Sequence, residues 1–193
     1  MVEIADCKNK KGFTIIEVVL VLAIAGLIFL MVFIALPALQ RSQRNTQRED
    51  DLARVLTAVN DYQSNNNGKT PFDPKITATD KLEKFVKRYL DSGCEKGAHP
   101  DSTVATKFTG DGVFKSCGGQ FSDPQGDPYV MSNKGKADGS AKDVSSDQYE
   151  KVFNGYYHAS CGDEGYTNPG TGDRDVAVYL KLEGGAIACN DNH

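Results

Sequence analysis

The sequence predicts an α+β protein in which the second half of a long N-terminal helix packs on a C-terminal antiparallel β-sheet. Three observations predict this fold. An apolar run occupies residues 13–36, an amphipathic stretch follows it to residue 62, and short alternating segments between turns fill the chain after residue 94. The length of 193 residues suits one modest domain with an appended segment.

The apolar run has only two polar side chains, Thr14 and Glu17. As a helix it would be about 36 Å long, enough to span the roughly 30 Å hydrocarbon core of a bilayer with some tilt. A secretory signal peptide and a plain signal anchor are the alternatives. A signal peptide usually has a shorter apolar core and a small-residue cleavage site. Here Pro37 leads instead into the polar residues 40–44, which are typical of a continuing helix.

The helix is predicted to continue as far as the turn at Ser64–Gly68. Its second half carries an apolar stripe at helical spacing, which we expect to form domain core. The stripe consists of Leu52, Val55, Leu56, Val59 and Tyr62. A second helix is predicted from Asp80 to Leu90.

Short segments after residue 94 predict the strands of the sheet, separated by turn residues. They are Val104–Phe108, Tyr129–Ser132, Val152–Ala159, Val176–Leu182 and Ala186–Cys189. The segment Val176–Leu182 alternates apolar and other residues, as a half-buried antiparallel strand does.

Charge and cysteine usage restrict the function. The net charge of −4 gives no reason to expect strong nucleic-acid binding. One cysteine, Cys7, precedes the apolar run, and four follow it: Cys94, Cys117, Cys161 and Cys189. If those four face an oxidising compartment they form two disulfides, and sequential pairing, 94–117 and 161–189, closes the shortest loops. The alternative is four buried, reduced thiols.

No set of residues in the sequence predicts catalysis or a cofactor. The three histidines are scattered, and no nucleophile, zinc or phosphate-loop motif occurs. His158 and Cys161 have a spacing that a metal could use, but a disulfide is favoured for Cys161. A calcium site is a minor alternative in the acidic, glycine-rich loop that contains Asp163, Glu164, Asp173 and Asp175.

The start of the apolar run combines a basic stub, a glycine, an aromatic residue and a carboxylate, in the sequence Lys10–Glu17. An ionisable residue in a membrane segment is costly and points to a function. If the chain is cut after Gly12, Phe13 acquires a charged α-amine. Glu17 of a neighbouring subunit can then pair with that amine and fix the axial offset between helices.

These residues resemble the class III leader and N-terminal helix of type IV pilins and pseudopilins. The resemblance implies cleavage after Gly12 and methylation of Phe13 by a prepilin peptidase, with Glu17 used in assembly. It implies a cleaved leader (1–12), a transmembrane and filament-core helix (13–36) and an extracytoplasmic pilin domain (37–193). Flanking basic residues do not set the orientation, because three precede the run and three follow it. Orientation therefore depends on the leader, which places the N-terminus in the cytoplasm.

By this resemblance we expect a non-enzymatic filament subunit of a type IV pilus, serving adhesion, motility or DNA uptake. Its partners would be copies of itself, the peptidase, an assembly ATPase and a membrane platform protein. The subunit would lie in the cytoplasmic membrane before assembly and at the cell surface after it. The segment Asp123–Tyr129 resembles a turn of major pseudopilins of type II secretion, so a pseudopilin is the alternative. A membrane-anchored enzyme is a third, less favoured class.

Overall fold

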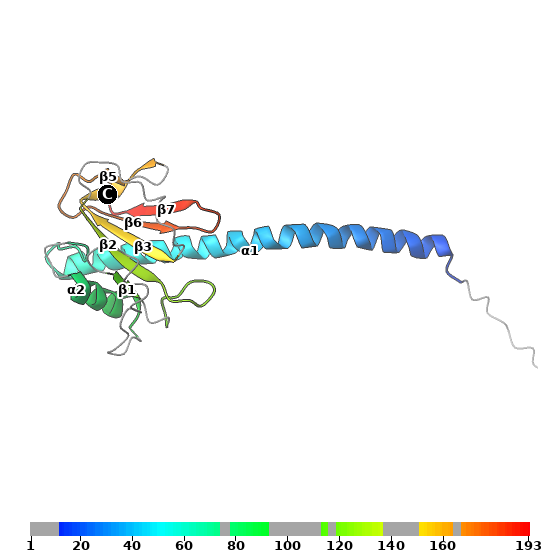
Figure 1. Cartoon of the computed structure of the whole chain (residues 1–193), viewed down its shortest axis with the longest axis horizontal. Coiled ribbons are helices and arrows are strands. Elements are labelled where there is room, and N and C mark those ends of the chain that lie inside the picture. Colours follow the sequence, from blue (N-terminus) through cyan, green and yellow to red (C-terminus); the bar gives the residue numbers. More distant parts are fainter. Residues whose placement is uncertain (1–11, 74–77, 93–112, 116–118, 137–150, 164–166) are drawn as a thin grey trace, which may run out of the picture. The chain divides into compact units, whose positions relative to one another are not determined.

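The computed structural model describes residues 12–73, 78–92, 113–115, 119–136, 151–163 and 167–193, with the backbone alone for 78–80 and 113–115. Figure 1 shows its elements. They are α1 (Ile15–Asn65), α2 (Ala78–Phe85), the π-helix η1 (Val86–Leu90), β1 (Val113–Lys115), β2 (Val130–Lys136), β3 (Val152–Tyr157), β4 (Ala159–Cys161), β5 (Thr167–Pro169), β6 (Val176–Lys181) and β7 (Ile187–Asp191). The chain divides into two compact units, residues 1–42 and 43–193.

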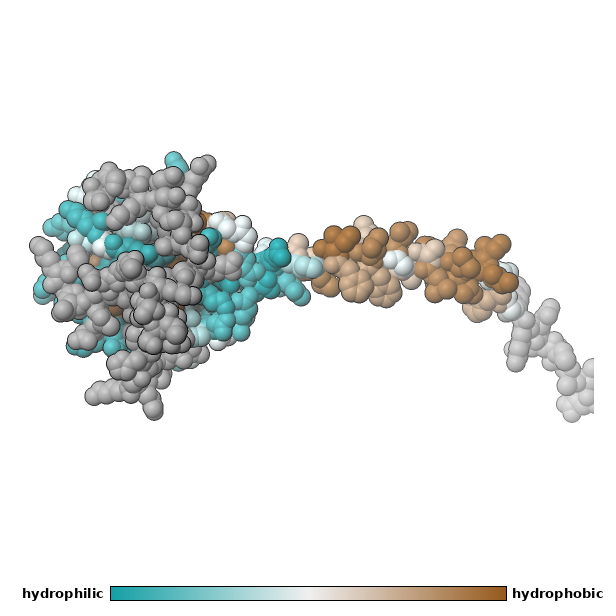
Figure 2. Space-filling model, viewed as in Figure 1, coloured by the Kyte–Doolittle hydropathy of each residue, from teal (hydrophilic) through white to brown (hydrophobic). Residues whose placement is uncertain are grey.

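The described part of the first unit is dominated by the apolar half of α1. Nineteen large apolar side chains between Phe13 and Leu39 are 43–89% exposed, and Figure 2 shows an almost continuous apolar surface along this segment. The helix is long and apolar enough to cross a membrane. A soluble monomer rarely exposes an apolar surface of this extent, so lipid or protein must cover it.

The helix begins at Ile15 and not at Phe13, which was predicted to start it. Residues 12–14 have no regular structure. It then stays helical through Gly26 and Pro37, the two residues with the lowest helix propensity in this part of the chain.

In the second unit the predicted apolar stripe of α1 is domain core. Leu52, Val55, Val59 and Tyr62 are buried, whereas Leu56 is half-buried. They pack in one cluster with side chains of α2, η1 and the sheet. The second predicted helix is present, but it begins at Ala78 and its last five residues form a π-helix.

Five strands of the described chain form a sheet in the order β1-β2-β3-β6-β7. The predicted antiparallel arrangement holds for every pair except β2 and β3, which are parallel. The predicted strand Val104–Phe108 lies outside the described residues. A separate two-stranded sheet pairs β4 with β5.

Strand β6 is buried on both faces, so the prediction from its alternation that only one face is buried is wrong. Val176, Val178 and Leu180 face the main core. Ala177 and Tyr179 belong to a second buried cluster that includes Ala159 of β4. The β4–β5 pair therefore packs on the second face of β6, a contact that alternation within β6 cannot predict.

Candidate functional site

The residues predicted for cleavage, Gly12 and Phe13, lie just before α1 in irregular backbone. Phe13 is 89% exposed, and apart from its neighbours in the chain no described residue has an atom within 4 Å of where a Cβ on Gly12 would stand. The peptide bond between them is thus free of helical hydrogen bonding and of neighbouring side chains within the described part of the chain.

The first turn of α1 is closed by a reciprocal cap between Thr14 and Glu17. Glu17 Oε2 accepts hydrogen bonds from the Thr14 backbone N–H and from Thr14 Oγ1, both at 2.9 Å. Thr14 Oγ1 in turn accepts a hydrogen bond from the Glu17 backbone N–H at 3.3 Å. This capping box satisfies two of the four amide groups that a helix start leaves unpaired.

The sequence contains the signal for this cap, in addition to the assembly role that the leader motif predicts for Glu17. A threonine followed three residues later by a glutamate, ahead of an apolar run, is the capping-box pattern. Glu17 therefore already has a structural role within a single subunit. Among the described residues only its Oε2 is engaged, which leaves Oε1 for a further partner.

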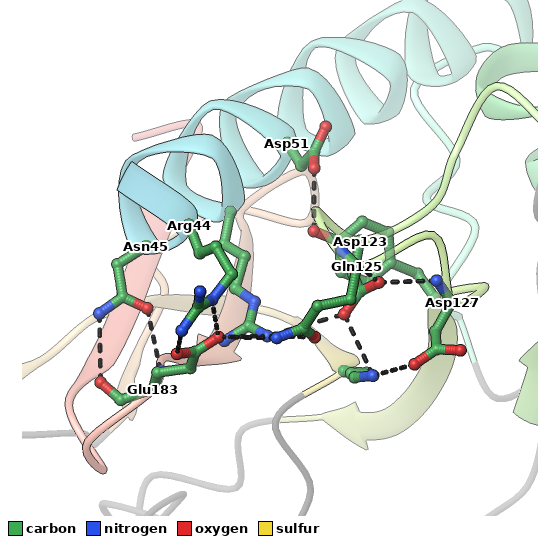
Figure 3. A network of polar contacts seen from close by, with 10 residues as sticks. Arg44, Asn45, Asp51, Asp123, Gln125, Asp127 and Glu183 are labelled. Carbon is green, nitrogen blue, oxygen red and sulfur yellow. Dashed lines mark hydrogen bonds and ion pairs between the residues drawn. The ribbon is translucent and has the colours of Figure 1, made fainter. Parts of the chain in front are cut away.

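A polar network joins the start of the second unit's helix segment to the β6–β7 turn (Figure 3). Arg44 donates two hydrogen bonds to Glu183, from Nε at 2.7 Å and from Nη2 at 2.6 Å. Asn45 makes two hydrogen bonds to the backbone of the same residue: its Nδ2 donates to the Glu183 carbonyl, and its Oδ1 accepts from the Glu183 N–H. The hydrogen bonds from Arg44 hold the pKa of Glu183 below its usual range.

Arg48, which is fully buried, extends this network to the turn at Asp123. Its Nη2 lies 3.3 Å from Glu183 Oε1 and 3.7 Å from Asp123 Oδ2. Among the residues that the structure describes, its Nε and Nη1 have no hydrogen-bond partner. Lys151 Nζ, 3.2 Å from Asp123 Oδ2, supplies a second cation to the buried carboxylate.

The predicted bend at Asp123–Tyr129 is present. Asp123 Oδ1 accepts hydrogen bonds from the N–H groups of Gln125 and Asp127, and Gly126 takes a φ of +88° that glycine tolerates at little cost. Tyr129 is buried against Phe121 and Phe153, as expected of a residue packing on the sheet.

The hydroxyl of Tyr129 ties the bend back to α1. It donates a hydrogen bond to Asp51 Oδ2 at 2.9 Å (Figure 3). Burial raises the pKa of Tyr129, and burial also raises the pKa of Asp51. Helix residues 44–51, the bend and the β6–β7 turn are thereby held as one polar assembly beside the apolar core.

The structure contains the disulfide between Cys161 and Cys189, which sequential pairing predicts, with Cα atoms 5.9 Å apart. Because Cys161 is in this bond, the metal alternative with His158 is wrong. The other predicted bridge, Cys94–Cys117, lies outside the described residues, as does Cys7.

The acidic loop considered for calcium has its described carboxylates in separate contacts. Asp173 pairs with His158 Nε2 at 3.0 Å. Asp175 accepts a hydrogen bond from the Gly172 N–H, which lowers its pKa. Glu164 lies outside the described residues. In the described part of the chain, no three histidine, cysteine or acidic side chains are grouped to hold a metal ion.

Comparison with known proteins bears on the N-terminal segment alone. Residues 7–33 match the model of the prokaryotic N-terminal methylation motif. The matched segment covers the end of the predicted leader and most of the apolar run, and it is similar to the class III prepilin N-termini of type IV pilins and pseudopilins. No curated protein and no solved structure matches the chain significantly.

The motif match and the α+β fold are both consistent with the pilin architecture that the N-terminal segment resembles. The apolar N-terminal helix fits anchoring in a membrane before assembly, and the leader implies processing by a prepilin peptidase and assembly into filaments.

Proposed function

We propose that the chain is a structural subunit of a type IV pilus, assembled through its N-terminal helix after removal of residues 1–12. The observation that carries the proposal is the exposed apolar half of α1, which begins directly behind a prepilin leader. Burying one large aliphatic or aromatic side chain is worth about 1.5–3 kcal/mol. The many side chains exposed here therefore strongly favour transfer into lipid and then into a bundle of neighbouring helices.

Cleavage of the leader would create the positively charged amine with which Glu17 is proposed to pair. Hydrolysis of the Gly12–Phe13 bond leaves a carboxylate on Gly12 and a free amine on Phe13, which methylation keeps basic. The irregular, exposed backbone at this bond suits entry into a peptidase. With Oε2 engaged by Thr14, the Oε1 atom of Glu17 is the acceptor for the Phe13 amine of a neighbouring subunit.

The capping box permits an experiment that separates the two roles of Glu17. Glu17→Gln keeps an acceptor for Thr14, because glutamine also serves in a capping box, but it removes the negative charge. Thr14→Val removes the two hydrogen bonds that the Thr14 hydroxyl makes to Glu17, leaves the one from the backbone N–H, and keeps the charge. We expect both variants to be cleaved after Gly12, the Gln variant to form few filaments, and the Val variant to form filaments at near the normal yield.

Filament yield is measured by shearing cells that make only the variant subunit, and cleavage by the mass of the membrane-bound subunit. Normal yield from Glu17→Gln would contradict the assembly role. The reverse pattern, with loss in Thr14→Val alone, would assign Glu17 to helix capping only.

The remaining partners follow from this assignment. Before assembly the subunit would be a single-pass protein of the cytoplasmic membrane, with its N-terminus in the cytoplasm. An assembly ATPase and a membrane platform protein would extract it into a helical homo-oligomer that reaches the cell surface and serves adhesion, motility or DNA uptake.

A pseudopilin of a type II secretion system is the second candidate, and the bend at Asp123–Tyr129 favours it. That bend is rigidly built, with Asp123 closing the turn and Tyr129 buried beneath it, and it resembles the turn of major pseudopilins. Electron microscopy of cells at native expression separates the candidates, because a pilin forms long surface fibres and a pseudopilin does not.

A further inference from the structure

A cavity of about 410 Å³ opens where the end of α1 meets α2 and η1. Four cationic side chains line it: Lys69, Lys81, Lys84 and Arg88. Three of them come from the helical segment 81–88 at spacings of three and four residues, which places them on one helix face. No acidic residue lines the cavity in the described part of the chain.

This cluster is unusual in a chain whose net charge is −4. Within the described residues none of the four cations forms an ion pair. The adjacent Lys87, by contrast, pairs with Glu83 at 2.5 Å and does not line the cavity. Like charges held close together repel one another, so an anionic ligand would relieve a repulsion that the described residues leave uncompensated.

Besides the cations, the cavity is lined by aromatic rings and by side-chain amides, two groups that are common in sugar-binding sites. Tyr62 and Tyr89 contribute aromatic surface, with ring centroids 5.8 Å apart. Three consecutive asparagines, residues 65–67, contribute amide oxygens that can accept hydrogen bonds from hydroxyls, since Nδ2 of Asn65 and of Asn66 already donates to a carbonyl of α1. The Nδ2 atom of Asn65 donates to the Tyr89 hydroxyl at 3.3 Å and so fixes the polar edge of that ring.

We propose that this cavity binds an acidic saccharide, a sugar ring bearing a carboxylate or sulfate group. The volume falls within the roughly 300–1,000 Å³ of small-molecule pockets, which is more than a single inorganic anion needs. Cations would bind the acidic group, the asparagine oxygens would accept hydrogen bonds from hydroxyls, and the polar edge of Tyr89, whose ring already contacts Phe85 and Arg88, would border the sugar. The proposal is independent of filament assembly, because every lining residue belongs to the second unit.

A nucleic acid is the less favoured ligand. Strands are held by a groove whose cations follow the backbone over several nucleotides, whereas these four cations surround one concavity. The overall negative charge of the chain also opposes a long polyanion.

The proposal is tested by calorimetric titration of the full chain in detergent micelles. The probes are trigalacturonate and a sulfated disaccharide, with neutral galactotriose and a single-stranded hexanucleotide for comparison. We expect at least one acidic saccharide to bind, with affinity that falls as salt is raised, and galactotriose to bind much more weakly. Lys84→Gln/Arg88→Gln should weaken binding about tenfold or more through the loss of two charge-assisted contacts.

Lys87→Gln is the matched control, because it removes one charge from the same helix outside the cavity. It should change the affinity by less than about twofold, and an unchanged melting temperature of each variant shows that the fold is kept. Failure of both acidic saccharides to bind, or equal losses in the control and the double variant, would overturn the proposal. Hexanucleotide binding that is as tight and equally dependent on Lys84 and Arg88 would reassign the cavity to nucleic acid.

Discussion

At the scale of single residues, two glutamates show how a neighbour decides what a carboxylate does. Glu17 accepts hydrogen bonds from Thr14 and closes the start of a helix. Glu183 receives two hydrogen bonds from Arg44 and holds the β6–β7 turn to α1. In the first case one oxygen has no partner among the described residues, and we propose that a neighbouring subunit binds it; in the second the carboxylate is used within the domain.

The pairing of Glu183 makes a prediction about acid stability. Its folded pKa is lowered by Arg44, so its contribution is present above the unfolded pKa of about 4.3 and is lost as the pH falls through the folded value. Glu183→Gln should therefore lower the melting temperature by about 2–4 °C at pH 7. The difference from the unaltered chain, measured by circular dichroism, should shrink as the pH falls below the unfolded value and vanish once the pH has fallen through the folded value.

Glu49→Gln is the matched control for this measurement, because Glu49 is an exposed glutamate of the same helix. It should leave the melting temperature nearly unchanged at both pH values. A difference between Glu183→Gln and the unaltered chain that is constant from pH 7 to pH 3 would contradict the role given to the Arg44 pair.

At the scale of elements, the close approach of Phe72 to β3 requires a glycine in that strand. A Cβ on Gly155 would lie 2.2 Å from Cε1 of the fully buried Phe72. Gly155→Ala should destabilise the domain by about 1–3 kcal/mol, the usual cost of overpacking. Phe72→Leu should relieve the clash. The double variant should therefore lose less stability than the sum of the losses in the two single variants.

Urea unfolding of the four proteins of this cycle measures the coupling. A favourable coupling of about 1 kcal/mol or more is expected for residues in direct contact. Strict additivity would show that Phe72 does not occupy the space above Gly155.

The disulfide ties the small β4–β5 sheet to the edge strand β7. Its cysteines are 28 residues apart, and a closed loop of that size is worth about 3–4 kcal/mol in the chain-entropy description. The double variant Cys161→Ser/Cys189→Ser should have a free energy of unfolding in urea that is lower by about this amount. The measurement is made without reductant so that the other cysteines are undisturbed. A loss below about 1 kcal/mol would mean that the burial of Ala159 and Tyr179 holds this sheet in place by itself.

Elements long enough to show a clear hydrophobic period could be predicted from the sequence, and elements too short to repeat that period could not. The stripe from Leu52 to Tyr62 covers three helical turns, and its burial is confirmed. Strands β1, β4 and β5 have three residues each, too few for alternation to be detected. The two buried faces of β6 depend on β4–β5, a contact that no local pattern contains.

The candidate site divides in the same way. The leader and Glu17 are local signals, and the motif match confirms the leader. The burial of Arg48 depends on Asp123 and Glu183, which are 75 and 135 positions away in the chain. Only the fold brings these charges together, and in the sequence Arg48 is simply one of several arginines that follow the apolar run.

At the scale of the whole molecule, the chain joins two units with opposite requirements. The described part of residues 1–42 exposes apolar side chains that need lipid or other helices, and residues 43–193 enclose their own core. A subunit held in a membrane and then transferred to a filament meets both requirements. We propose that the change between these states begins with hydrolysis of one peptide bond, Gly12–Phe13, which would create the amine that Glu17 is proposed to bind.

Mass spectrometry of the N-terminal peptide, from subunits purified out of membranes and sheared filaments, tests this account most directly. We predict that the mature chain begins at Phe13 and carries one methyl group on its α-amine, with Gly12 and everything before it removed. A chain that still begins at Met1, or one cut at any bond other than Gly12–Phe13, would contradict the account.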